Sequence, residues 1–122
     1  MSRIAAVAAA AVALSTALAA DAPYPGMQPL TGQFDIAGAT AVDPPADEPR
    51  DTHLRVHLTG EAARALYEHM KVSPEEHPCG DPEGLSKSIG SMTCLRRHAD
   101  GGHECWFAID IAEQRVEGGW AC

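Results

Sequence analysis

MTCLRRHADGGHECWFAIDI, residues 92–111, is the stretch that decides the fold. Runs of alternating apolar and polar residues lie on both sides of Asp100-Gly101. Asp-Gly is a strong hairpin signal, because a type I′ turn needs positive φ at both central residues. The stretch therefore predicts a β-hairpin with one arm over residues 88–97 and the other over residues 103–111.

A two-residue turn at Asp100-Gly101 would also set the register of this hairpin. Cys94 then lies opposite Phe107 and Leu95 lies opposite Trp106. Because strand side chains alternate between faces, one face becomes apolar and the other mixed. The apolar face holds Met92, Cys94, Cys105, Phe107, Ile109 and Ile111. The mixed face holds Leu95, Arg97, Glu104, Trp106 and Asp110.

A third strand is predicted over residues 116–122, after a connection formed by residues 112–115. That connection pairs large residues of the apolar face with one another, which agrees with the hairpin pattern. The predicted pairs are Ile111 with Val116, Phe107 with Trp120, and Cys105 with Cys122.

Residues 52–58, THLRVHL, alternate strictly and predict a half-buried strand. A helix over residues 60–71 follows, with Thr59 as the N-cap candidate, and the Pro- and Gly-containing segment 73–87 is predicted to be a loop. The expected fold class is α+β, in which a strand, a helix and a three-stranded antiparallel meander form a small domain over residues 52–122. A domain of this size is expected to need disulfide staples.

The four cysteines, Cys79, Cys94, Cys105 and Cys122, are an even number and allow three disulfide connectivities. In the predicted register Cys94 and Cys105 are diagonal, about 7–8 Å apart. That distance is at the limit for bridging without backbone movement. The expected pairs are therefore Cys79–Cys94 and Cys105–Cys122.

Two segments precede the domain. Residues 1–20 combine Arg3 with an apolar, alanine-rich run, which is the layout of a signal peptide cleaved after Ala19 or Ala20; the alternative is a membrane anchor. Residues 21–51 are acidic and rich in proline, and we interpret them as a linker or arm. A rival interpretation is that this arm docks on the domain through Tyr24, Leu30, Phe34 and Ile36.

These features favour a periplasmic or secreted protein with no membrane anchor after cleavage. The formal net charge of −8 argues against nucleic acid as a partner. No acid, base and nucleophile can be assembled from the motifs, so no catalytic residue and no enzyme activity are expected. His98 and His103 are the best candidates for a pair of metal ligands, but we interpret them as solvated polar residues. No metal and no cofactor are therefore expected.

One candidate binding patch remains, on the mixed face of the sheet. Trp and Arg often anchor interfaces, and here they occur beside a local basic run. The patch consists of Leu95, Arg96, Arg97, His98 and Trp106. The alternatives are that the Pro-rich arm covers this face, or that Trp106 is merely half exposed.

The leading hypothesis is a small exported, non-catalytic binding or inhibitory module whose partner is another exported protein. One alternative is a structural or stress-related envelope protein with no dedicated ligand. Another is a small secreted enzyme. The sequence predicts neither the identity of the partner nor the oligomeric state.

Overall fold

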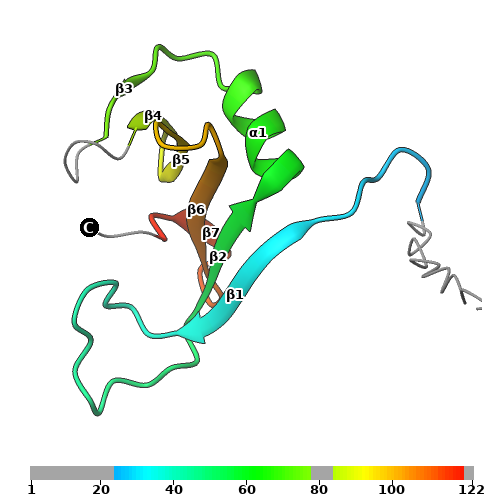
Figure 1. Cartoon of the computed structure of the whole chain (residues 1–122). Coiled ribbons are helices and arrows are strands. Elements are labelled where there is room, and N and C mark those ends of the chain that lie inside the picture. The colour runs from blue at the N-terminus through cyan, green and yellow to red at the C-terminus, as the bar shows by residue number, and fades with distance from the viewer. Residues whose placement is uncertain (1–23, 78–83, 120–122) are drawn as a thin grey trace, which may run out of the picture.

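The computed structural model describes residues 24–77 and 84–119. Within them the protein is mostly one antiparallel sheet of seven strands, with one short helix on one face (Figure 1). The strands are β1 (Thr31–Ala37), β2 (His53–Thr59), β3 (Glu75–Glu76), β4 (Gly84–Ile89), β5 (Met92–Arg97), β6 (His103–Asp110) and β7 (Arg115–Glu117). Helix α1 (Gly60–His69) follows β2 directly.

Strand β6 is the centre of the sheet. The strand order is β1-β2-β6-β5-β4-β3, and β7 also pairs with β6. One edge of β6 pairs with β2 along seven residues, from His53↔Asp110 to Thr59↔Glu104. Its other edge is shared, because β5 pairs with its first half and β7 with its second half.

The predicted architecture of a strand, a helix and a three-stranded meander was wrong, because the sheet also contains β1, β3 and β4. Strand β1 lies inside the segment assigned to a Pro-rich arm, and it pairs with β2 along its whole length. The prolines nearest to β1 are Pro29 and Pro44, which flank the strand and leave its pairing intact.

Residues 84–87 of β4 lie in the segment that was predicted to be a loop, and Ser88 and Ile89 lie in the predicted hairpin arm over 88–97, which begins only at Met92 in the structure. Strand β4 forms a hairpin with β5 across Gly90-Ser91, which is another strong two-residue turn signal. Gly90 has φ +58°, and a positive φ at the first central position alone is the pattern of a type II′ turn.

The predicted register of the β5–β6 hairpin was wrong by two residues. The structure pairs Cys94 with Cys105 in place of Phe107. The turn is a four-residue loop, closed by hydrogen bonds from Arg97 N to Gly102 O (2.9 Å) and from Gly101 N to Arg97 O (3.0 Å). Only Gly101 in this loop has positive φ, so a type I′ turn is ruled out. A shift of two residues keeps every side chain on its predicted face.

The β6–β7 pairing is shifted by two residues as well, since Val116 lies opposite Ile109 and not Ile111. The predicted strand over 116–122 is observed as Arg115–Glu117, and Trp120 lies outside the described residues.

The disulfide joins Cys94 to Cys105, so the predicted pairs Cys79–Cys94 and Cys105–Cys122 were wrong. Cys79 and Cys122 lie outside the described residues, as does the predicted signal peptide over residues 1–20. The prediction failed because it depended on the shifted register, which placed Cys94 and Cys105 diagonally. In the observed register they are directly opposed, a position from which strand neighbours can be bridged.

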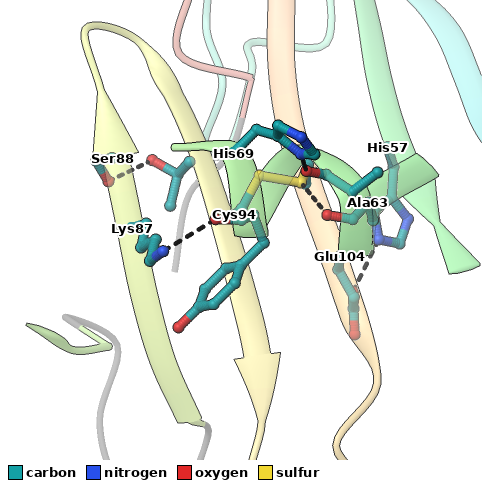
Figure 2. Close-up of a disulfide and its surroundings, with 11 residues drawn as sticks. His57, Ala63, His69, Lys87, Ser88, Cys94 and Glu104 are labelled. Carbon is teal, nitrogen blue, oxygen red and sulfur yellow. Dashed lines mark hydrogen bonds and ion pairs between the residues drawn. A yellow bond between two sulfur atoms is a disulfide. The ribbon is translucent and has the colours of Figure 1, made fainter. Parts of the chain in front are cut away.

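Helix α1 packs over this disulfide, and the core lies between them (Figure 2). Ala63 is fully buried, and its carbonyl oxygen lies 3.6 Å from Cys105 Sγ. The buried core consists of Leu58, Ala63, Tyr67, Met70, Cys94 and Cys105, with Val56, Leu66 and Phe107 packed against it. The small side chain of Ala63 lets the helix approach the disulfide closely.

The predicted start of α1 is confirmed, since the helix begins at Gly60 with Thr59 as its N-cap residue, although the Thr59 side chain makes no capping hydrogen bond. The helix ends at His69 rather than residue 71. Lys87 of β4 donates from Nζ to the carbonyl oxygens of Tyr67 (3.1 Å) and Met70 (3.3 Å), so a cation satisfies the carbonyls that the last turn leaves free. Among the described residues, no helix is long and apolar enough to span a membrane.

The disulfide yields the first prediction. Replacing both Cys94 and Cys105 by Ala should lower the free energy of unfolding by roughly 3 kcal/mol, because the unfolded chain loses a short cross-linked loop. Urea unfolding of the variant and the wild type measures the difference, with Ser88→Ala, an exposed neighbour, as the control. A non-reduced peptide map of the wild type that joins Cys94 to any cysteine other than Cys105 would contradict this fold.

The membership of β1 in the sheet yields a second prediction. Gly32 has φ +154°, and a Cβ there would collide with the backbone carbonyl oxygen of His57. Gly32→Ala should therefore weaken the β1–β2 pairing, and amide hydrogen exchange in β2 should become faster. Gln33→Ala, next to it and exposed, is the matched control and should leave exchange unchanged. Equal protection in both variants would mean that β1 does not pair as described.

Candidate functional site

The face of the sheet that holds α1 is only partly covered by the helix. Beyond α1, large apolar side chains remain exposed in β1 and just before it, with exposed fractions of 69% for Leu30, 74% for Phe34 and 45% for Ile36. Exposed apolar side chains that form a contiguous patch mark interaction sites more reliably than single ones do.

The register joins these side chains into two rows across the sheet, because residues in register point to the same face. One row is Phe34, Val56 and Phe107. The next row is Ile36, Leu54, Ile109 and Val116. We call Leu30, Phe34, Ile36, Leu54, Val56, Ile109 and Val116 the apolar surface.

A groove of about 430 Å³ lies within the apolar surface at its β1 side. Its lining is Leu30, Gly32, Gln33, Phe34, Leu54, Val56 and Leu58. Gln33 is the one polar side chain in this set, so the groove is suited to apolar side chains of a ligand.

Strand β1 is also an edge of the sheet. Within the described residues it pairs with β2 alone, so the backbone groups along its other edge are not used in the sheet (Figure 1). Natural proteins commonly protect an edge strand with lysine, proline or a bulge. Residues 31–37, TGQFDIA, contain no lysine and no proline, and the β1–β2 register is continuous.

The surroundings of β1 are acidic. Asp35 lies in the strand itself, on the face opposite to Phe34. Residues 24–51 hold five carboxylates, which are Asp35, Asp43, Asp47, Glu48 and Asp51, against the single base Arg50. Asp35 is the carboxylate within β1, where Arg55 is its partner on β2, and the other four lie in the segment that follows the strand.

The patch predicted from the sequence is split by the structure. Leu95 is only 2% exposed, so it is covered and cannot contact a partner. Arg96 is exposed but lies on the helix-bearing face, opposite His103, and His98 is exposed in the β5–β6 loop. Arg97 and Trp106 lie on the polar face, which is the face of the sheet opposite α1; Leu95 lies on this face too, so these two are its members that are not buried.

Trp106 is half-buried in a polar network. Its ring stacks on His57 with centroids 5.2 Å apart. His57 Nε2 lies 2.8 Å from Glu104 Oε2 (Figure 2), and Glu104 also pairs with Arg97. Arg97 in turn donates to Asp100 (3.0 Å), which lowers the pKa of that carboxyl. The sequence prediction found Arg97 and Trp106 but missed His57, whose place beside Trp106 depends on the β2–β6 register.

A second groove, of about 320 Å³, lies beside this network on the polar face. It is lined by Gln33, Phe34, Asp35, Arg55, Val56, His57, Trp106 and Gly119. Its cation, Arg55, donates to the carbonyl oxygens of Thr40 (2.5 Å) and Gly38 (3.4 Å), so the guanidinium holds the segment after β1.

The metal candidates differ from the sequence interpretation too. His98 and His103 do not oppose each other, and the ring of His103 contacts Tyr67 with centroids 5.2 Å apart. Burial lowers the pKa of His103. Among the described residues, three groups close enough to hold one ion come from three strands: His53, Asp110 and Glu117.

In this cluster His53 Nε2 lies 3.1 Å from Glu117 Oε2 and 3.8 Å from Asp110 Oδ2. The pKa of Asp110 is lowered, chiefly by a hydrogen bond from the backbone N–H of Glu113, and that of Glu117 is lowered, chiefly by Arg115. Both carboxyl groups are therefore ionised at neutral pH.

Comparisons with known proteins found no matching family model, no matching curated protein and no matching solved structure.

The apolar surface yields a third prediction. Phe34→Thr should leave folding nearly unchanged, because the ring is largely exposed and Thr suits a strand. It should also reduce the fluorescence of the dye 8-anilinonaphthalene-1-sulfonate bound to the native protein, since the dye reports exposed apolar surface. The matched control is Val72→Thr, an exposed valine after α1 and away from the apolar surface. An equal loss in both variants would mean that the dye does not report this surface.

Proposed function

We propose that this protein is an exported, non-catalytic protein-binding module that captures an extended apolar segment of another exported protein along β1. The observation that supports this proposal most strongly is Phe34, which is 74% exposed beside Leu30 and Ile36 on an edge strand. Exposing that much apolar surface costs solubility, and binding a partner gives the exposure a function.

The mode of binding follows from the free edge of β1. A partner segment adds a strand to the sheet, so its backbone hydrogen-bonds to β1 while alternate side chains enter the groove beside Phe34. The groove volume of about 430 Å³ suits a few aliphatic or aromatic side chains. The main-chain bonds contribute affinity, and the groove contributes the preference for apolar side chains.

Charge distinguishes the partner from a second copy of this chain. The net charge of the chain and the carboxylates in and after β1 favour a segment with Lys or Arg beside its apolar residues. Two copies paired through β1 would bring together two chains with a formal net charge of −8 each. We therefore propose a basic, apolar partner segment and a monomeric protein.

Export is part of the same proposal. It is supported by the signal-peptide layout of residues 1–20, and the disulfide between Cys94 and Cys105 is compatible with an oxidising compartment.

The fourth prediction tests binding directly. A phage library of random 12-residue peptides, selected on the purified protein, should yield peptides in which apolar residues alternate and Lys or Arg flanks them. A synthetic peptide from the selection should bind Phe34→Thr at least tenfold more weakly than the wild type, as the loss of an interface anchor predicts. Isothermal titration calorimetry measures both affinities.

Val72→Thr and Trp106→Ala are the controls, and both should bind this peptide like the wild type. Failure to enrich any peptide over the Phe34→Thr protein would contradict the proposal. A peptide that loses affinity with Trp106→Ala but not with Phe34→Thr would move the site to the polar face. Analytical ultracentrifugation that shows a dimer lost in Phe34→Thr would make a second copy the occupant and overturn the proposed partner.

A further inference from the structure

We propose that His53, Asp110 and Glu117 form a Zn²⁺ site that ties together β2, β6 and β7. This site is independent of the proposed function, since it lies on the polar face and the apolar surface lies on the other. Imidazole and carboxylate are both ligands that zinc takes in proteins, and three protein ligands leave a fourth position for water.

The donor atoms of the three side chains lie close enough together to bind one zinc ion. Zinc bonds of about 2.0–2.1 Å in tetrahedral geometry place neighbouring ligand atoms about 3.3 Å apart. His53 Nε2 lies 3.1 Å from one carboxylate oxygen and 3.8 Å from the other, and the three donor atoms all lie within 4.8 Å of one another. Shifts of a few tenths of an ångström bring the two distances from His53 to the required value, and the two carboxylate oxygens would close around the ion as it binds.

Each of the three side chains also has an outer polar atom, which points away from the proposed ion and has a hydrogen-bond partner of its own. His53 Nδ1 lies 2.7 Å from Thr52 Oγ1. Asp110 Oδ1 accepts from the backbone N–H of Glu113 (2.9 Å). Glu117 Oε1 accepts from Arg115 Nε (2.9 Å) and Nη2 (2.8 Å). Outer contacts of this kind orient the ligands of metal sites and fix the histidine tautomer.

The three side chains are partly or largely shielded from solvent. The side chain of His53 is 9% exposed, that of Asp110 is 16% exposed and that of Glu117 is 32% exposed. Asp110 and Glu117 bring two negative charges to a poorly solvated imidazole and Arg115 balances one of them, so the negative charge that remains attracts a divalent cation. The alternative to a metal ion is a proton on His53 Nε2, which would make the imidazole an ion-pair partner of Asp110 and Glu117.

The backbone supports this assignment. His53 and Asp110 are partners in the β2–β6 register, and Glu117 lies on β7, which pairs with the same half of β6. Ligands on paired strands are held more firmly than ligands on loops. A bound ion would therefore bridge the start of β2, the end of β6 and the end of β7.

The test uses the purified full chain without an affinity tag, stripped with EDTA and titrated with ZnCl₂ by calorimetry. We expect one zinc per chain, and no detectable binding at this site in His53→Gln or in Asp110→Asn. Thr52→Val, which removes the partner of Nδ1, should weaken zinc affinity by about 10–100-fold. The matched control is His57→Gln, because His57 also pairs with a glutamate on the polar face, and it should bind zinc like the wild type.

A second readout keeps the test decisive if a variant is destabilised. Zinc should raise the melting temperature of the wild type and of His57→Gln, but not that of Asp110→Asn. Co²⁺ should give visible absorption bands in the wild type that His53→Gln lacks. Absence of zinc binding by the wild type would overturn the proposal and leave the proton as the occupant. Equal binding in the wild type, His53→Gln and Asp110→Asn would overturn it as well, since the ion would then be held elsewhere.

Discussion

The direct opposition of Cys94 and Cys105 is the constraint on which the rest of the structure depends. This opposition fixes the register of β5 on β6, and Ala63 of α1 packs on the disulfide that joins the two cysteines. Because β6 also pairs with β2 and β7, the position of β6 determines where both of these strands present their side chains. A slip by one residue would exchange the two faces, and the apolar residues of β2 and β6 would leave the helix side.

Both proposed sites follow from this frame, one on each face. Helix α1 is only ten residues long and packs beside the disulfide, so the outer side chains Phe34 and Ile36 of β1 and Val116 of β7 remain exposed. On the other face the same register brings His53 opposite Asp110, with Glu117 alongside. The apolar surface is suited to an apolar protein segment because its side chains carry no charge. The cluster of His53, Asp110 and Glu117 is suited to a cation because its two carboxylates are negative.

The sequence was informative where the signal is local. Alternation identified β5 and β6 and their faces within the predicted arms 88–97 and 103–111, THLRVHL identified β2, and the helical spacing of Ala63, Leu66 and Tyr67 identified α1. Register was not predictable from Asp100-Gly101, because the same dipeptide ends a four-residue loop as readily as it forms a two-residue one. The error of two residues then led to the wrong disulfides. Strand β1 was missed because flanking prolines dominate the composition of its segment. The β4–β5 hairpin was missed although Gly90-Ser91 is a usable turn signal.

The candidate sites were harder to predict for a related reason. His53 and Glu117 are 64 residues apart in sequence, and no local pattern brings them together. Trp106 was correctly placed on the polar face, but its stacking on His57 depends on the pairing of β2 with β6. Leu95 illustrates the limit of alternation, since alternation gives the face of a side chain but not whether that face is covered.

The central claim is the register of the sheet around β6, and nuclear Overhauser contacts between Cα protons test it most directly. In antiparallel pairs that do not exchange backbone hydrogen bonds, the Cα atoms lie about 4.5 Å apart and their protons give strong contacts. The structure predicts such a contact between Cys94 and Cys105, whose Cα atoms are 4.0 Å apart. A contact between the Cα protons of Cys94 and Phe107 in its place would contradict the register, and with it both proposed sites.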